Sequence, residues 1–220
     1  MVHCNNCTSD LNAWVNLFKE YQELLGIPVD MNEVYGKLYN NALNGNPDCG
    51  GLISYNYISG EPVTGLAEGR PLFVRSANDK FNLANFMRAH LYASVGVLKI
   101  GNDILFNEEK IKVDRITGHG GLFKTKGVGQ RVLAAAINSP ISVMETAGEG
   151  GAWGIALLAS YLVNNNDKLN LADYLDTVVF AGDAGVEIAP TPEDVEGFNV
   201  YIENYKAGLA IEEAAVKAKK

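Results

Sequence analysis

The sequence predicts an α/β domain in which a mixed sheet carries helices on both faces. Residues 112–144 give the main indication. A strand-like alternation from Lys112 to Ile116 precedes a helical segment, Val128 to Ile137, and a second short strand, Ile141 to Met144. Strand, helix and strand in this order are typical of a crossover unit with a parallel sheet. At 220 residues the chain is long enough for one domain with a substantial core.

The other helices are predicted from apolar residues at helical spacing and from the residues that end them. Ser9 or Asp10 is expected to cap the first helix. Gly101, followed by Asn102-Asp103, predicts a chain reversal after the third helix. Pro190-Thr191-Pro192 predicts an extended linker before the last helix. The expected helices are Leu11–Leu25, Asn32–Leu43, Leu83–Val97, Ala152–Leu162, Leu171–Val179 and Glu193–Lys217.

Composition excludes several classes of function. The formal net charge is −8 and no basic block is present, which argues against a nucleic-acid partner because phosphate binding needs clustered Lys and Arg. Apolar runs such as Ile155 to Val163 are too short to span a bilayer. The start of the chain lacks the pattern of a secretory signal. We therefore expect a cytoplasmic protein without a membrane partner.

The three cysteines are predicted to be reduced structural thiols. They are an odd number in a chain with no secretion signal. Cys4-x-x-Cys7 also fits a zinc or redox motif, but zinc would need two further ligands. His90 is predicted to be a packing or surface residue rather than a ligand.

Two glycine-rich turns each lead into a helix, Gly118-His119-Gly120-Gly121 and Gly148-Glu149-Gly150-Gly151. Glycine has no Cβ and permits positive φ, so such turns let the backbone approach a flat ligand or a phosphate. The same pattern also occurs in turns that only pack. On these residues alone, both interpretations stay open.

The segment from Ile116 to Ala159 resembles the adenosine-binding segment of the FGGY carbohydrate kinases, a branch of the actin-like ATPase fold. That family has a glycine-rich turn, a helix with a Gln near its middle and a short strand. An acidic residue followed by Ala-x-Gly-x-Ala comes next. Gln130 stands where the family has Gln, and the final pattern is matched by Glu149, Ala152, Gly154 and Ala156.

Other pieces of the chain resemble the family in the same order. Val2 to Trp14 resembles the opening of its second domain, Ile53 to Glu61 its Pro-Tyr-Leu-x-Gly-Glu-Arg segment, and Asn82 to Gly96 the helix that follows. Asn56, Pro62 and His119 depart from the usual residues, which leaves the subfamily and the sugar open. L-ribulokinase-like and xylulokinase-like members are the most similar.

The resemblance implies a ribonuclease H-like domain that binds ATP, with Mg²⁺ as the metal of the whole kinase. The two glycines Gly120 and Gly121 would lie against adenine or ribose, and Thr125 would contact adenine. Lys124 would face the ribose or solvent, and Glu149 would fix the second glycine turn. The expected nucleotide-site residues are Gly118, Gly120, Gly121, Lys124, Thr125 and Glu149.

The resemblance further implies that residues 1–220 are the C-terminal, nucleotide-binding domain of a longer kinase, lacking its first strands. The sugar site and the catalytic Asp would lie in an N-terminal domain, so no catalytic or metal-binding residue is expected here. Asp183, in a Gly-Asp dipeptide, follows the adenosine segment, whereas the family's catalytic Asp precedes the second domain. The parent would phosphorylate a hydroxyl of a sugar, a ketopentose by this resemblance, and the fragment alone would be inactive.

A second function stays open beside the kinase. An actin-like module that has lost kinase activity would keep the same glycine turns and bind nucleotide for regulation. The absence of the first strands would leave a sheet edge either exposed or covered by pairing, as in a homodimer.

Overall fold

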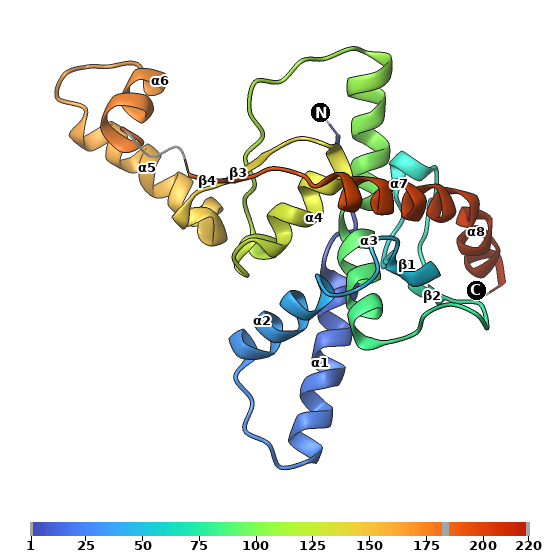
Figure 1. Cartoon of the computed structure of the whole chain (residues 1–220). Helices are drawn as coiled ribbons and strands as arrows, with labels where there is room; N and C mark the ends of the chain where they lie inside the picture. Colours follow the sequence, from blue (N-terminus) through green and yellow to red (C-terminus); the bar gives the residue numbers. More distant parts are fainter. Residues whose placement is uncertain (1, 182–184, 219–220) are drawn as a thin grey trace.

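The computed structural model describes residues 2–181 and 185–218, and shows a mainly helical domain with two small sheets (Figure 1). Helix α3, Leu83–Asp103, runs through the middle and packs against α2, β1 and α4. The other helices are α1 (Ser9–Leu24), α2 (Met31–Ala42), α4 (Val128–Ile137), α5 (Gly150–Asn164), α6 (Leu171–Tyr174), α7 (Pro192–Ala207) and α8 (Leu209–Ala218). The strands are β1 (Ile53–Tyr55), β2 (Leu72–Val74), β3 (Ile141–Val143) and β4 (Val186–Ile188).

The core surrounds α3, which is buried on nearly every side from Asn85 to Val97. The Asn82 side chain caps this helix by accepting a hydrogen bond from the Asn85 amide at 2.9 Å. Tyrosines from β1 and α7 pack beside α3, and Tyr201 donates its hydroxyl hydrogen bond to the Ala89 carbonyl at 3.2 Å. The helix that precedes the first glycine turn is therefore fixed from several directions.

The mixed sheet predicted from the sequence is not formed by the described residues. β1 pairs with β2 and β3 with β4, both antiparallel. The predicted strand from Lys112 to Ile116 is an exposed extended segment, and only a parallel bridge between Thr117 and Ser142 remains of the crossover. The parallel direction was predicted correctly. The strand itself was wrong, because the segment bends at Asp114 and meets β3 only at its end, where the Ile116 carbonyl accepts the Ser142 amide at 2.9 Å.

The predicted chain reversal at Gly101 is also wrong, since α3 continues to Asp103 and passes into a π-helical turn, Ile104–Glu108. A Cβ on Gly101 would lie 2.4 Å from the Val2 side chain, so this glycine makes room for the N-terminal segment. Lys99 and Asp103, one turn apart, form an ion pair at 2.5 Å that supports the extra turn.

The predicted last helix is divided in two at Gly208. The Tyr55 hydroxyl donates a hydrogen bond to the Tyr205 carbonyl at 2.9 Å, and a Cβ on Gly208 would lie 2.1 Å from that hydroxyl. The Tyr205 carbonyl would otherwise accept the amide of residue 209, so the helical ladder stops there.

The remaining predicted helices agree with the structure to within two residues at each end, with one correction at a cap. α1 begins after Thr8 and has no side-chain cap, so neither Ser9 nor Asp10 caps it. Both residues lie inside the first turn of α1, whereas an N-cap residue lies just before the helix and has a non-helical backbone. The predicted helix from Leu171 to Val179 is present as α6 and a π-helical turn, Leu175–Val179.

Helices α5 and α6 form an arm that stands apart from the α3 core (Figure 1). α5 is rich in apolar residues, yet none of its described side chains is buried, and Leu162 is 83% exposed. The arm is held together by Tyr161 and Tyr174, whose ring centroids lie 5.3 Å apart. Across the described residues, no helix combines the length and apolar character needed to cross a bilayer.

Candidate functional site

The structure brings the two glycine turns together. The Gly120 amide donates a hydrogen bond to the Ala147 carbonyl at 2.8 Å, and the Gly118 amide donates one to the Ser142 carbonyl at 2.9 Å. A Cβ on Gly150 would lie 3.2 Å from the His119 ring. Two turns that lie 30 residues apart in the sequence therefore form one surface beside the start of α4.

Each glycine of the first turn is required, or left unexplained, for a different physical reason. Gly118 is buried, and a Cβ there would lie 2.5 Å from the Phe123 ring, so close packing requires glycine. Gly120 has φ 107° and ψ −178°, a conformation that L side chains rarely adopt. Gly121 is exposed, and a Cβ there would meet no atom within 4 Å. Neither packing nor φ explains Gly121, whose surface is open to a ligand.

Helix α4 starts directly after this surface. Gly127 adopts the left-handed conformation with φ 81° at the N-cap, and its carbonyl accepts the Arg131 amide at 3.0 Å. The N-terminal amides of a helix carry a partial positive charge and suit an anionic ligand. Thr125 precedes this turn, is half-buried, and accepts the Val128 amide at 3.3 Å through its carbonyl.

A cavity of about 580 Å³ lies beside the two turns, with Gly148 of the second turn in its lining. This volume is within the range of small-molecule sites. Most of its wall is apolar, with a few polar groups from the loop before α4. Its lining includes Phe123, Lys124, Lys126, Gln130, Gly148 and Val186.

The predicted site residues fall into three groups in the structure. Lys124 lines the cavity, whereas Gly118, Gly120, Gly121 and Thr125 lie in the adjoining turn and do not line it. The backbone of Glu149 ends the 3₁₀ turn before α5, but its side chain is outside the described structure. Asp183 also lies outside the described residues.

Sequence reasoning did not assign Lys126, Gln130, Val186 or Ile188 to the site. Gln130 was noted only for its match to a family position, although its side chain joins α4 to two strands. Its Nε2 donates to the Ile141 carbonyl at 3.0 Å and to the Val186 carbonyl at 2.7 Å. No local pattern could reveal Val186 and Ile188 as wall residues, because they reach the cavity by pairing with β3 across some 45 residues.

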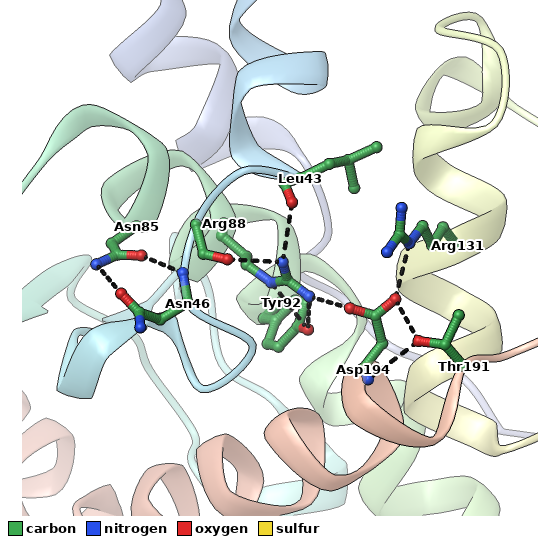
Figure 2. Close-up of polar contacts among 9 residues, drawn as sticks. Leu43, Asn46, Asn85, Arg88, Tyr92, Arg131, Thr191 and Asp194 are labelled. Atoms are coloured by element: carbon green, nitrogen blue, oxygen red, sulfur yellow. Dashed lines mark hydrogen bonds and ion pairs between the residues drawn. The ribbon is translucent and has the colours of Figure 1, made fainter.

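Helix α4 is anchored to the core by Asp194 at the start of α7 (Figure 2). Its carboxylate accepts hydrogen bonds from Arg88 at 2.5 Å, Arg131 at 2.7 Å and Thr191 at 2.9 Å. Burial alone would raise the pKa of Asp194, but the hydrogen bonds from Arg131, Thr191 and Arg88 hold that pKa below its usual value. Asp194 is therefore ionised at neutral pH and ties α3, α4 and α7 together.

Arg88 is fully satisfied inside the core (Figure 2). Its guanidinium donates to the Gly45 carbonyl at 3.1 Å and to the Tyr92 hydroxyl at 2.9 Å, in addition to Asp194. Its side chain is only 4% exposed. A buried arginine with all its donors used is structural, and its role is to hold α3 against α7.

His90 agrees with the sequence prediction, and of the three cysteines Cys49 is buried whereas Cys7 is exposed. Cys4, Cys7 and Cys49 are free thiols, and burial, with a smaller effect of Glu61, raises the pKa of Cys4 to about 11. His90 is buried among Trp14 and Phe86, and burial lowers its pKa to about 3. Its Nδ1 lies 3.0 Å from the Ser54 hydroxyl, which makes it a neutral packing residue.

Comparison with known structures shows the fold. A ligand-bound xylulose kinase from Lactobacillus acidophilus matches 80% of this chain with a TM-score of 0.61 and 21% identity, and 35% of its own chain is covered. Gluconate kinase from the same organism matches 80% of this chain with a TM-score of 0.58 and 21% identity, and 35% of its chain is covered. Plasmodium falciparum glycerol kinase with ADP matches 80% with a TM-score of 0.58 and 18% identity, and 33% of its chain is covered.

The chain thus spans about a third of the length of these solved structures. A search of curated protein sequences found no match. The sequence profile of the FGGY family of carbohydrate kinases, C-terminal domain, matches residues 1–163, which include both glycine turns and α4. This chain belongs to the FGGY family of carbohydrate kinases and carries the family's C-terminal domain.

Proposed function

We propose that this chain is the nucleotide-binding half of a cytoplasmic, ATP-dependent sugar kinase that phosphorylates a hydroxyl of a ketopentose. The observation that carries the proposal is the open surface at Gly121, in the first of two glycine turns that pack together beside a cavity. The resemblance to a xylulose kinase structure supports the choice of sugar, and the gluconate and glycerol kinases among the neighbours show how broad the fold's substrates are.

The residues present suit an adenine nucleotide. The cavity beside the turns has apolar walls such as Phe123 and Val186, which fit the faces of a base. Lys124 and Lys126 line the cavity together with one carboxylate, Glu145, so two positive charges offset one negative charge where a phosphate chain would lie. The backbone amides at the start of α4 add hydrogen-bond donors and a partial positive charge, which also favour phosphate.

Mg²⁺ would reach this site with the phosphates of ATP and would neutralise the charge that develops on them during transfer. Among the described residues, no three His, Cys, Asp or Glu side chains come together as a metal site. Because the chain spans about a third of the length of the kinases that it resembles, we assign the metal ligands, the sugar site and the general base to the rest of the kinase. Closure of the cleft between the two halves would exclude water and align the sugar hydroxyl with the γ-phosphate.

The test of the nucleotide site is a titration of ATP and ADP followed by amide NMR shifts. We expect shifts in residues 117–131 and 144–151, with weak affinity because one side of the site is missing. Gly121→Val should weaken binding by more than about tenfold, because the valine side chain would occupy the open surface. Gly36→Val, in α2, is the matched control, since a Cβ there also meets no atom within 4 Å. Equal binding by Gly121→Val would move the site elsewhere.

The proposed division of labour has its own test. The chain alone, with MgATP and either a ketopentose or a polyol, should give no phosphorylation above background. Turnover would contradict the assignment of the base and sugar site to the rest of the kinase. Kinase activity of the longer protein would separate this proposal from an inactive regulatory module, which would bind nucleotide and transfer nothing.

A further inference from the structure

The cavity beside the glycine turns is lined by one amide side chain that the proposed function does not yet use. Gln130 lies on α4, lines the cavity and is 5% exposed. The surrounding wall residues Val143, Val186 and Ile188 are apolar. An uncharged polar group between apolar walls determines which edge of a flat ligand can be accommodated beside it.

The orientation of the Gln130 amide is fixed by the two strands. Both hydrogens of Nε2 are used, one by the Ile141 carbonyl at 3.0 Å and one by the Val186 carbonyl at 2.7 Å. Rotating the amide by half a turn would place its oxygen against two carbonyl oxygens, which is strongly unfavourable. Gln130 can therefore offer a ligand only an acceptor, its Oε1.

That acceptor is unused within the described part of the chain. No hydrogen bond to Gln130 Oε1 is formed there, and the atom is not completely shielded from solvent. A carbonyl oxygen held in an apolar cavity favours a ligand edge that donates a hydrogen bond. Adenine presents an exocyclic amino group at its six position, whereas guanine presents a carbonyl oxygen there.

We propose that Gln130 selects adenine over guanine by accepting a hydrogen bond from the exocyclic amino group of the base. This inference rests on the proposed nucleotide-binding function and adds the residue that sets base specificity. Strand β4 has a direct part in it, because the Val186 carbonyl holds the amide in the selective orientation. Guanine in the same position would bring its carbonyl oxygen against Oε1. Both oxygens are acceptors, so neither would receive a hydrogen bond there.

The test uses the wild-type chain and three ligands: ADP, the diphosphate of purine riboside, which lacks the amino group, and GDP. We expect ADP to bind about tenfold more tightly than the des-amino nucleotide, the value of one hydrogen bond. GDP should bind about a hundredfold more weakly than ADP, because a repulsion replaces the bond. Competition with ADP establishes that all three share one site. The side-chain NH₂ signals of Gln130 should shift with ADP more than with the des-amino nucleotide.

A variant gives an independent measurement. Gln130→Met removes the acceptor and should bring the affinities for ADP and GDP to within about threefold of one another. If this variant does not fold, because it also loses two strand contacts, the ligand series on the wild type decides. Equal affinity for ADP and the des-amino nucleotide, with both lost in Gly121→Val, overturns the role of Gln130 and leaves the nucleotide site intact. Binding of no nucleotide overturns the proposed function and this inference with it.

Discussion

The α3 core and the α5–α6 arm differ both in the residues that they contain and in what surrounds those residues. α3 carries polar and charged side chains, Asn85, Arg88 and His90, that are almost completely buried. α5 is the more apolar helix, yet Ile155 is 69% exposed and Leu162 is 83% exposed. Apolar character alone therefore does not decide whether a helix of this chain is buried. A facing surface is also needed, and α3 has one on every side.

Removing the charge at the centre of the core should have the largest effect on stability. Asp194→Ala leaves Arg88 buried without a counter-charge, so we expect the free energy of unfolding to fall by about 3–5 kcal/mol. Glu203→Ala is the matched control on the surface of α7, where the ion pair with Lys206 spans 3.0 Å and the Glu203 side chain is 72% exposed. We expect this control to change stability by less than about 0.5 kcal/mol. Urea unfolding measures both, and similar losses would contradict the structural role of Asp194.

A methyl group added to one helical glycine in each region should have opposite effects. In α7, a Cβ on Gly197 would lie 2.3 Å from the backbone of Pro47, so Gly197→Ala should cost about 1–3 kcal/mol. In α5, a Cβ on Gly154 would meet no atom within 4 Å. Gly154→Ala should stabilise the arm by about 1 kcal/mol through helix propensity. Urea unfolding reports the first change and amide exchange across α5 the second. A loss in both regions would show that the arm is packed in solution.

His90 predicts how the stability of the core depends on pH. Burial lowers its pKa to about 3 in the folded protein, well below its unfolded value near 6.5. The unfolded chain therefore takes up a proton first as pH falls, and stability drops by about 1.4 kcal/mol per pH unit between these values. Unfolding free energies at pH 5.5 and 4.5 test this, with His90→Gln as the comparison. In the variant, the change of unfolding free energy with pH should be smaller by about 1.4 kcal/mol per pH unit, the value for one bound proton. An unchanged slope would exclude His90 as its cause.

The smallest effect is expected on the exposed face of the arm. Leu162→Ser should change the free energy of unfolding by less than about 0.5 kcal/mol, because the leucine already lies in water. Leu91→Ala is the control in α3, where burial is complete and the cost should be about 2–5 kcal/mol. Urea unfolding of the two variants measures this difference. A large loss for Leu162→Ser would reveal a surface that covers α5 in solution.

Local features were predictable from the sequence and long-range ones were not. Helix α4 has the predicted ends, because Gly127 and Asn138 both adopt left-handed conformations that start and stop it. The turn at Gly101 and the single last helix were predicted wrongly, because Val2 and Tyr55, distant in sequence, decide those positions. One wall of the candidate site was similarly out of reach. The glycine turns are local motifs, whereas the walls contributed by Val186 and Ile188 depend on strand pairing.

The anchoring of α4 by Asp194 also has a consequence for the order in which the chain is made. Arg88 and Arg131 precede their carboxylate by 106 and 63 residues. A ribosome that has just completed the two glycine turns has therefore produced both cations without the anion that neutralises them. The surface formed by the two glycine turns is encoded early, but the carboxylate that anchors α4 beside it is made late, with the last helices. A C-terminal truncation before Asp194 would thus remove no residue of the glycine turns and still leave them unsupported.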